Sequence, residues 1–202
     1  MNEFDDKARG WDTDEKRRRA ETVAARIREI VPLRDDMAAF EYGCGTGLLS
    51  FALQPYLGDI TLADSSAGML EVAREKIAQT NASGMSPLHI DLAVDPVPDE
   101  RYDLVYTLMT LHHVRPLERV LANLATLLLP GGYLCIADLD TEDGSFHGEQ
   151  FDGHHGFDRR ELGEKLTRLG LQVDNVDDCF TMTKETAAGQ RSFSVFLLVA
   201  HR

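Results

Sequence analysis

The chain has 202 residues, of which 43% are hydrophobic, and a formal net charge of −13 at pH 7. This size fits one domain with a sizeable core, so we expect residues 1–202 to form a single domain. The acidic surface disfavours a nucleic-acid partner, because it repels a phosphate backbone. The sequence contains no apolar run long enough for a membrane span, and the polar residues 2–9 are not expected to form a signal peptide.

The cysteine content favours a reducing compartment. Cys44, Cys135 and Cys179 are odd in number and widely spaced, which disfavours a disulfide framework and a cysteine-bound zinc ion. We therefore expect a cytoplasmic protein. The sequence does not indicate an oligomeric state.

The first predicted element is an amphipathic helix over residues 14–31. Apolar residues recur at helical spacing from Ala20 to Ile30, and Pro32 ends the helix. Residues 16–19 form the only basic run of the chain, and we assign this run to the solvated face of the helix.

A glycine-rich turn follows the next predicted element, a buried strand over residues 37–40. Gly43, Gly45 and Gly47 occupy alternate positions, and Leu48 begins a segment with helical spacing. Strand, glycine turn and helix together are typical of a nucleotide-binding βαβ unit, in which glycine lets a ligand approach the backbone. The turn is one residue shorter than the G-x-G-x-x-G dinucleotide fingerprint, which disfavours a nicotinamide cofactor.

Acidic residues lie at the ends of the next two predicted strands. The strand over residues 59–64 places Asp64 roughly 20 residues after the turn, where nucleotide-binding folds carry the acid that binds ribose. A carboxylate suits this position because it can accept hydrogen bonds from two hydroxyl groups. The two serines after Asp64 are expected to cap the following helix. The third strand, over residues 87–92, carries Asp91 near its end.

The C-terminal half continues the alternation of strands and helices. The predicted strands cover residues 101–107, 133–138, 172–184 and 192–201, and the predicted helices cover residues 117–128 and 159–169. Residues 130–132 are a turn before the second of these strands, and residues 186–190 join the last two strands as a hairpin. The connection over residues 138–157 has little periodicity, and connections of this length are usually functional or disordered.

In this order, the motifs resemble those of the class I S-adenosylmethionine-dependent methyltransferases. The first motif of that family, an acidic residue followed by x-G-x-G-x-G, matches residues 41–47, and its Leu-Pro-Gly-Gly matches residues 129–132. Its fourth motif, a strand that begins at an aspartate and ends near a leucine–histidine pair, matches Asp103 to His112. The resemblance implies an α/β fold: a doubly wound, Rossmann-like three-layer sandwich, with a mostly parallel seven-stranded sheet and an antiparallel C-terminal hairpin.

The resemblance also implies that S-adenosyl-L-methionine is the cofactor. The residues that it assigns to the cofactor are Trp11, Glu41, Gly43, Cys44, Gly45, Gly47, Asp64, Ser65, Met69, Asp91, Leu92, Thr107 and Leu108. Asp64 would bind the ribose, Asp91 the adenine amino group, and the backbone around Thr107 and Leu108 the methionine part. Core packing is an equal alternative for Met69, and an exposed turn acid is the alternative for Asp64.

Residues 4–12 resemble the lead-in that folds over the cofactor pocket in many small methyltransferases, and we assign residues 1–31 to an N-terminal lid and helix. Trp11 would then belong to a lid, and the alternative is that it only pins the N-terminus to the body.

Histidines are the candidates for contact with the methyl acceptor. His112 and His113 follow the fourth strand, and we expect one of them to line the acceptor pocket; a catalytic base and a satisfied helix start are alternatives. The loop over residues 138–157, assigned to the acceptor pocket, contributes His147, His154 and His155. With Asp152 these three could hold zinc, but two adjacent histidines do not easily share one ion, so no metal is expected. Disorder is the alternative for this loop.

The expected activity is methyl transfer from S-adenosylmethionine to a small-molecule acceptor by in-line displacement. Two alternatives stay open at this point. A cofactor-binding or scaffold module with a methyltransferase fold would carry the same motifs. A nicotinamide-dependent oxidoreductase is disfavoured by the glycine spacing. The sequence does not identify the acceptor, because one fold serves many acceptors.

Overall fold

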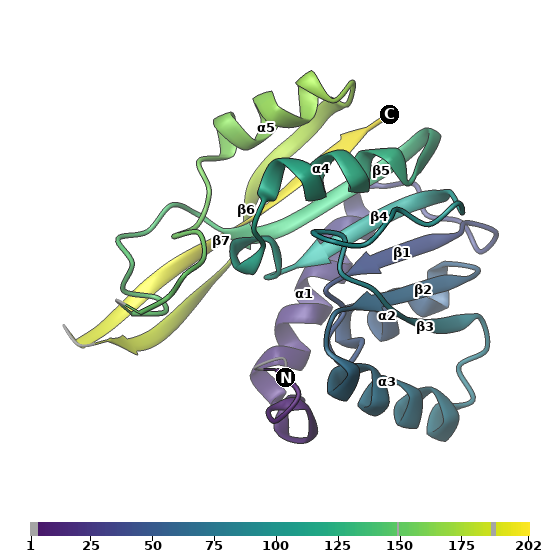
Figure 1. Cartoon of the computed structure of the whole chain (residues 1–202), viewed down its shortest axis with the longest axis horizontal. Helices are drawn as coiled ribbons and strands as arrows, with labels where there is room; N and C mark the ends of the chain where they lie inside the picture. The colour runs from purple at the N-terminus through teal and green to yellow at the C-terminus, as the bar shows by residue number, and fades with distance from the viewer. Residues whose placement is uncertain (1–3, 149, 187–188) are drawn as a thin grey trace.

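A seven-stranded sheet forms the centre of the computed structural model, which describes residues 4–148, 150–186 and 189–202 (Figure 1). The strands lie in the order β3-β2-β1-β4-β5-β7-β6, with the bounds β1 Ala39–Tyr42, β2 Ile60–Asp64, β3 Met85–His89, β4 Tyr102–Leu108, β5 Leu128–Leu139, β6 Gln172–Thr186 and β7 Gly189–His201. Strands β1 to β5 are parallel, whereas β7 runs antiparallel to both β5 and β6. The predicted Rossmann-like α/β fold, with a mostly parallel sheet and antiparallel C-terminal strands, is confirmed.

Helices cover both faces of this sheet. Their bounds are α1 Asp14–Ile30, α2 Leu48–Leu53, α3 Ala67–Thr80, α4 Leu117–Thr126 and α5 Arg159–Arg168. On one face, α1, α2 and α3 bury residues such as Ile27, Leu49 and Leu70, and on the other α4 and α5 bury Leu121 and Leu166. Burial from both sides explains why the central strands are almost continuously apolar. Across the described residues, no helix has both the length and the apolar character that crossing a membrane requires.

Side-chain caps fix where three of the helices begin. Thr13, Ser66 and Asp158 each accept a hydrogen bond from the backbone N–H three residues later, at the starts of α1, α3 and α5. Ser66 confirms that a serine after Asp64 caps the following helix. The described residues also form three short 3-10 helices, η1 Ala8–Gly10, η2 Gln54–Tyr56 and η3 Leu111–His113.

The third strand lies earlier in the chain than its apolar pattern predicts. It spans residues 85–89 instead of 87–92, so Asp91 lies in the loop beyond it. This loop is ordered by the carboxylate of Asp95, which accepts a hydrogen bond from the backbone N–H of Asp91 at 2.8 Å. The apolar residues at 90 and 92 are buried without belonging to the ladder, which is why they resemble strand residues in the sequence.

The predicted turn at residues 130–132 lies inside β5. Tyr102 of β4 pairs with Leu128, but Leu104 pairs with Tyr133, so β5 has more residues than its partner between these pairs. The extra residues bulge out of the ladder, and Gly131 adopts a φ of +78° there. The turn residues therefore interrupt the pairing without ending the strand.

The last two strands form a long hairpin that projects from the body, and the segment after β5 lies beside it (Figure 1). Phe146 of that segment packs against Phe193 of β7, with ring centroids 5.0 Å apart. Arg191 of β7 donates a hydrogen bond to the Ser145 hydroxyl at 3.0 Å. The described part of the segment is therefore attached to the hairpin. The predicted turn over residues 186–190 includes residues 187 and 188, which lie outside the described residues.

Candidate functional site

A cleft of about 830 Å³ opens at the carboxyl ends of the parallel strands. Strands β1 and β4 lie side by side there, and the chain continues outward from them in opposite directions, to β2 and β3 on one side and to β5 on the other. Ligands of open α/β sheets bind at such a reversal point. The cleft is walled by the glycine turn, the ends of β2 and β4, the N-terminal segment and the loop after β5, and its volume is typical of a small-molecule site.

The glycine turn after β1 forms one wall of the cleft. Gly43, Gly45 and Gly47 have φ values of +68°, +54° and +84°, which residues with side chains rarely adopt. A Cβ atom on Gly43 would lie 2.1 Å from Cγ2 of Thr110, and one on Gly47 would lie 2.7 Å from a leucine of β2. These two glycines are therefore required for packing. A Cβ atom on Gly45 would instead have only ordinary contacts, the nearest 3.5 Å away at Nε1 of Trp11.

Two carboxylates line the cleft, one at the end of β2 and one in the loop beyond β3. Asp64 accepts hydrogen bonds from the backbone N–H groups of Gly45 at 2.7 Å and of Ser66 at 2.8 Å. Burial raises the pKa of Asp64, and these two backbone hydrogen bonds act in the opposite direction. The carboxylate of Asp91 lies 3.5 Å from the hydroxyl of Tyr42. A carboxylate offers about four lone-pair positions, so both acids can accept further hydrogen bonds from a ligand.

The carboxyl group of Glu41 is bound at the start of α2. It accepts hydrogen bonds from the backbone N–H of Ser50 at 3.1 Å and from the Ser50 hydroxyl. The same hydroxyl lies 2.7 Å from that of Tyr106. Burial raises the pKa of Glu41 to about 8, against the opposing effect of Ser50. The acid that opens the glycine motif therefore joins β1 to α2, and it is largely protonated at pH 7.

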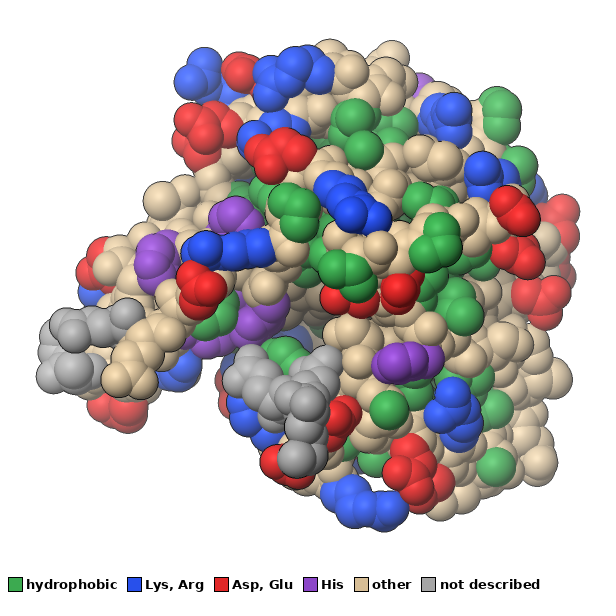
Figure 2. Space-filling view, viewed as in Figure 1, with side chains coloured by type: hydrophobic (Ala, Val, Ile, Leu, Met, Phe, Trp, Pro, Cys, Tyr) green, Lys and Arg blue, Asp and Glu red, His purple; other side chains and the backbone are tan. Residues whose placement is uncertain are grey.

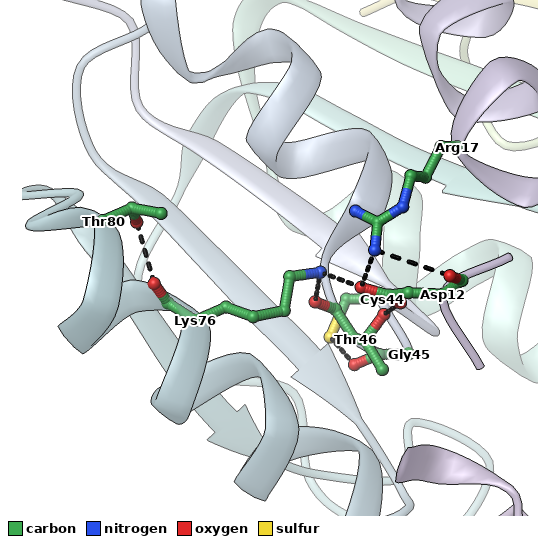
Figure 3. A network of polar contacts seen from close by, with 7 residues as sticks. All are labelled: Asp12, Arg17, Cys44, Gly45, Thr46, Lys76 and Thr80. Carbon is green, nitrogen blue, oxygen red and sulfur yellow. Dashed lines mark hydrogen bonds and ion pairs between the residues drawn. The ribbon is translucent and has the colours of Figure 1, made fainter. Parts of the chain in front are cut away.

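The N-terminal segment is attached to the glycine turn through Asp12 (Figure 3). The Thr46 hydroxyl donates a hydrogen bond to the Asp12 carboxylate. Lys76, reaching across from α3, donates to the same carboxylate at 2.8 Å and to the Thr46 carbonyl at 2.9 Å. Arg17 of α1 approaches the carboxylate to 3.6 Å. One carboxylate thus connects the N-terminal segment, the glycine turn and two helices.

A second attachment lies at the start of α3. Asp5 accepts hydrogen bonds from the Ser66 hydroxyl at 2.6 Å and from the backbone N–H of Gly68 at 3.1 Å. Beside these attachments, the rings of Phe4 and Trp11 pack edge to face with centroids 5.9 Å apart, and both rings line the cleft. The segment before α1 is therefore held against the cleft at two points.

Three histidines line the end of the cleft next to the loop after β5. The ring centroid of His112 lies 4.2 Å from that of His113 and 5.2 Å from that of His147, and the last two are 5.0 Å apart. His112 is buried, and its Nδ1 donates a hydrogen bond to Asp138 at 2.6 Å. Burial lowers the pKa of His113 to about 3 and that of His147 to about 4. In both cases electrostatic repulsion from His112 is the second-largest cause of the lowered pKa. The rings of His113 and His147 are therefore neutral at pH 7.

Most of the predicted site residues lie on the wall of this one cleft. They are Trp11, Glu41, Gly43, Cys44, Gly45, Asp64, Ser65, Met69, Asp91, Leu108, His112, His113 and His147. Among the residues that the structure describes, five predicted ones lie outside the wall: Gly47, Leu92, Thr107, His154 and His155. The ring of His154 is hydrogen-bonded to the carbonyl of Val114 at 3.0 Å, and Nδ1 of His155 lies 3.4 Å from the carboxylate of Glu142. These two rings are thus engaged by neighbouring residues.

Several cleft residues were not predicted from the sequence. Lys16 and Arg19 of the basic run, assigned to the solvated face of α1, line the cleft instead, and Lys16 lies 3.1 Å from the centroid of the Trp11 ring. Burial is the largest cause of the lowered pKa of Lys16. Phe146 and Phe151 flank His147 in a polar loop, and two aromatic residues in such a segment are the signal that could have indicated packing against the body.

The fold and the glycine turn together match those of a methyltransferase domain. The family model of the methyltransferase domain matches residues 40–136, which run from β1 into β5 and include Gly45, Asp64 and Asp91. Residues 40–136 therefore form a domain of the methyltransferase family, and the whole fold is that of the S-adenosylmethionine-dependent methyltransferases.

Particular relatives agree with this assignment. An uncharacterized methyltransferase of Schizosaccharomyces pombe is 34% identical over 122 residues, which are 57% of this chain and 43% of that protein. The O-methyltransferase cnsE of Penicillium expansum is 32% identical over 135 residues, 64% of this chain and 49% of that protein. A crystal structure of a SAM-dependent methyltransferase from Aquifex aeolicus shares the fold with a TM-score of 0.73 at 20% identity, over 98% of this chain and 97% of that one. The chain therefore spans less than half the length of these two curated relatives.

Proposed function

We propose that this chain binds S-adenosylmethionine and transfers its methyl group to a small-molecule acceptor. The observation that carries the proposal is the contact between Gly45 and Asp64, at 2.7 Å. It places a backbone position without a side chain beside a carboxylate, in a cleft of small-molecule size. Adenosine needs both features, because its ribose offers two hydroxyl donors and must approach the backbone closely.

The residues of the cleft suit the remaining parts of this cofactor. We assign Asp91, beyond β3, to the adenine amino group, and Met69 to an apolar contact with the cofactor beside Gly45. The sulfur of Met69 lies 3.9 Å from the position of a Cβ on Gly45. Leu108, at the end of β4, is assigned to the methionine part. The segment before α1, which contains Trp11, is assigned to a lid, since Asp5 and Asp12 hold it against the cleft.

The proposed chemistry is an in-line displacement. S-adenosylmethionine, when bound, supplies a methyl group that its sulfonium charge already activates. The acceptor atom forms a bond to the methyl carbon as the carbon–sulfur bond breaks, and the acceptor proton leaves for solvent or a neighbouring group. The chain itself binds the cofactor and the acceptor, orients them relative to each other and excludes water. We assign the orientation of the acceptor to His112, His113 and His147, which line one end of the cleft.

The acceptor is proposed to be small because the cleft is partly enclosed by the N-terminal segment and the loop after β5, and because the chain carries a net charge of −13. We also propose that residues 1–202 act as one methyltransferase domain in a reducing compartment. The three cysteines are free, which is consistent with such a compartment.

Titration calorimetry with S-adenosylhomocysteine tests the cofactor assignment. We expect Asp64→Asn to weaken binding by about 10- to 100-fold, because hydrogen bonds to a charged carboxylate contribute roughly 1.5–3 kcal/mol. Asp99→Asn removes the same charge from an exposed position outside the cleft and should leave the affinity unchanged. Absence of binding at millimolar ligand, or equal affinities of the two variants, would exclude the proposed site.

Transfer is tested separately with S-adenosylmethionine carrying a labelled methyl group and a fractionated cell extract. Label in the small-molecule fraction supports the proposal, and label in the macromolecular fraction contradicts the acceptor class. Cofactor binding without transfer to any fraction would favour a binding module with a methyltransferase fold.

A further inference from the structure

Three imidazole rings face one another where η3 meets the loop after β5. One ring nitrogen from each of His112, His113 and His147 lies within 4.8 Å of the other two. Figure 2 shows histidine side chains gathered near the recess beside the projecting hairpin. In the described part of the chain, no other group of three or more histidine, cysteine or acidic side chains brings its ligand atoms together in this way.

The rings are held by neighbours that leave nitrogen atoms available. The Nδ1 atom of His112 is engaged by Asp138, which leaves Nε2 as its free ligand atom. The ring of Phe151 stacks on that of His147, with centroids 3.9 Å apart and an interplanar angle of 21°. Within the described residues, no protein hydrogen bond reaches a ring nitrogen of His113 or His147. His112 is buried, His113 is half-buried and His147 is exposed, so the cluster extends from the protein interior to solvent, where a small ligand could be shared by the three rings.

We propose that His112, His113 and His147 bind a divalent transition-metal cation of the zinc class, with one coordination position open to the cleft. Three histidine ligands with a fourth position left for a small molecule are the pattern of catalytic zinc sites. Asp138 on the far nitrogen of His112 is the carboxylate partner that commonly orients a metal-binding histidine. Nitrogens around such an ion lie about 3.3 Å apart, so side-chain rotations that move the rings about 1.5 Å closer complete the geometry.

The sequence leads us to expect no metal, and the set weighed there, His147, His154 and His155 with Asp152, differs from the set proposed here. His154 and His155 are engaged elsewhere, by the carbonyl of Val114 and the carboxylate of Glu142, so only His147 of the loop takes part. Adjacent histidines do not easily share one ion in an extended segment. The 3-10 turn overcomes this difficulty, because it brings the ring centroids of His112 and His113 to 4.2 Å.

The open position would hold the acceptor, and this step rests on the proposed function. A zinc-class ion favours the deprotonated form of a bound hydroxyl or thiol, with the proton released to solvent. The acceptor class that follows is a small molecule with a hydroxyl or thiol group, bound through that oxygen or sulfur atom.

Metal binding is tested on the full chain without cofactor, so its failure is distinguishable from failure of the methyltransferase proposal. Chelator-treated protein is titrated with Zn²⁺ by calorimetry and with Co²⁺ by visible absorption. We expect one equivalent to bind, with the absorption of four- or five-coordinate Co²⁺, and azide to change that spectrum by entering the open position. His147→Ala should weaken Zn²⁺ binding by about tenfold or more. The matched control, His155→Ala, changes a histidine of the same loop and should leave the Zn²⁺ affinity unchanged.

A second variant tests the buried ligand of the proposed site, His112. His112→Ala would remove one of the three hydrogen-bond donors to the buried Asp138 and leave a cavity, which could prevent folding, whereas Asp138→Asn keeps an acceptor oxygen near His112. We expect Asp138→Asn to weaken Zn²⁺ binding about tenfold in protein whose circular dichroism is unchanged. Non-stoichiometric binding, or equal Zn²⁺ affinities of His147→Ala and His155→Ala, would overturn the metal site. A Co²⁺ spectrum that azide leaves unchanged would overturn the open position.

Discussion

The Nδ1 atom of His112 donates a hydrogen bond of 2.6 Å to Oδ1 of Asp138, and both side chains are buried. The same carboxylate accepts hydrogen bonds from the backbone N–H groups of Leu111, at 2.9 Å, and Leu139, at 2.8 Å. One buried acid at the end of β5 therefore fixes the turn that follows β4. This turn carries two of the three histidines at the cleft.

Removal of this carboxylate should destabilise the fold. Asp138→Ala leaves three buried donors without their acceptor, so we expect a loss of about 3 kcal/mol in the free energy of unfolding. Asp138→Asn keeps one acceptor oxygen and should lose less. Urea unfolding followed by circular dichroism measures both changes, with the exposed Asp99→Ala as the control. An Asp138→Ala variant as stable as this control would show that the buried acid does not hold the turn.

Two glycines with positive φ allow the effect of ligand contact to be distinguished from the effect of backbone strain. Gly45 has a φ of +54° and faces the cleft, whereas Gly131 has a φ of +78° and nothing within 4 Å of an added Cβ. Alanine at either position should cost about 1 kcal/mol of stability, because both backbones are left-handed. Only Gly45→Ala should also weaken the binding of S-adenosylhomocysteine in calorimetry. Equal affinities of the two variants would place the cofactor away from this turn.

The attachment of the N-terminal segment should control cofactor exchange. Asp12→Ala removes the acceptor for Thr46 and Lys76, so the segment should open more readily. S-adenosylhomocysteine should then dissociate faster by at least about fivefold, the effect of about 1 kcal/mol for each lost hydrogen bond. Trp11 is the only tryptophan of the chain and lines the cleft, so its fluorescence in stopped-flow experiments reports this rate directly. Glu21→Gln, on the exposed side of α1, is the control. Equal dissociation rates in the two variants would exclude a lid role.

The buried carboxyl group of Glu41 should make stability depend on pH. Its pKa is raised from an ordinary value of 4.5 to about 8. The unfolded chain therefore loses this proton at lower pH than the folded chain. The protonated Glu41 carboxyl group makes its full contribution to the free energy of unfolding below pH 4.5. This free energy then falls by up to about 5 kcal/mol as the pH rises to 8.

Glu41→Gln measures this contribution, because the amide stays neutral at every pH. The stability of the variant relative to the wild type should rise between pH 4.5 and 8 and then level off. Urea unfolding of both proteins across this range provides the comparison. Parallel stability curves would show that Glu41 ionises in the folded protein as it does in the unfolded chain.

Local patterns were sufficient to predict the fold and one half of the cleft. The spacing of Gly43, Gly45 and Gly47 after an apolar strand defines a turn of a particular kind, and Asp64 follows at a fixed distance because one helix and one strand lie between them. Parallel strands end at the same edge of the sheet, so residues at their carboxyl ends meet whatever the intervening loops contain. These are properties of chain geometry over short distances.

The other half of the cleft depends on contacts between segments far apart in the chain. His147 reaches His112 because Phe146 packs on β7 and Asp138 holds η3, and no periodicity in the loop records either contact. The attachment of Asp12 to Thr46 and Lys76 likewise joins three separate segments. The sequence by itself determined the Rossmann-like sheet and its glycine turn, because secondary-structure periods and turn conformations are local. Only the tertiary structure decided which histidines share one site, because side-chain packing between distant segments sets the orientation of their rings.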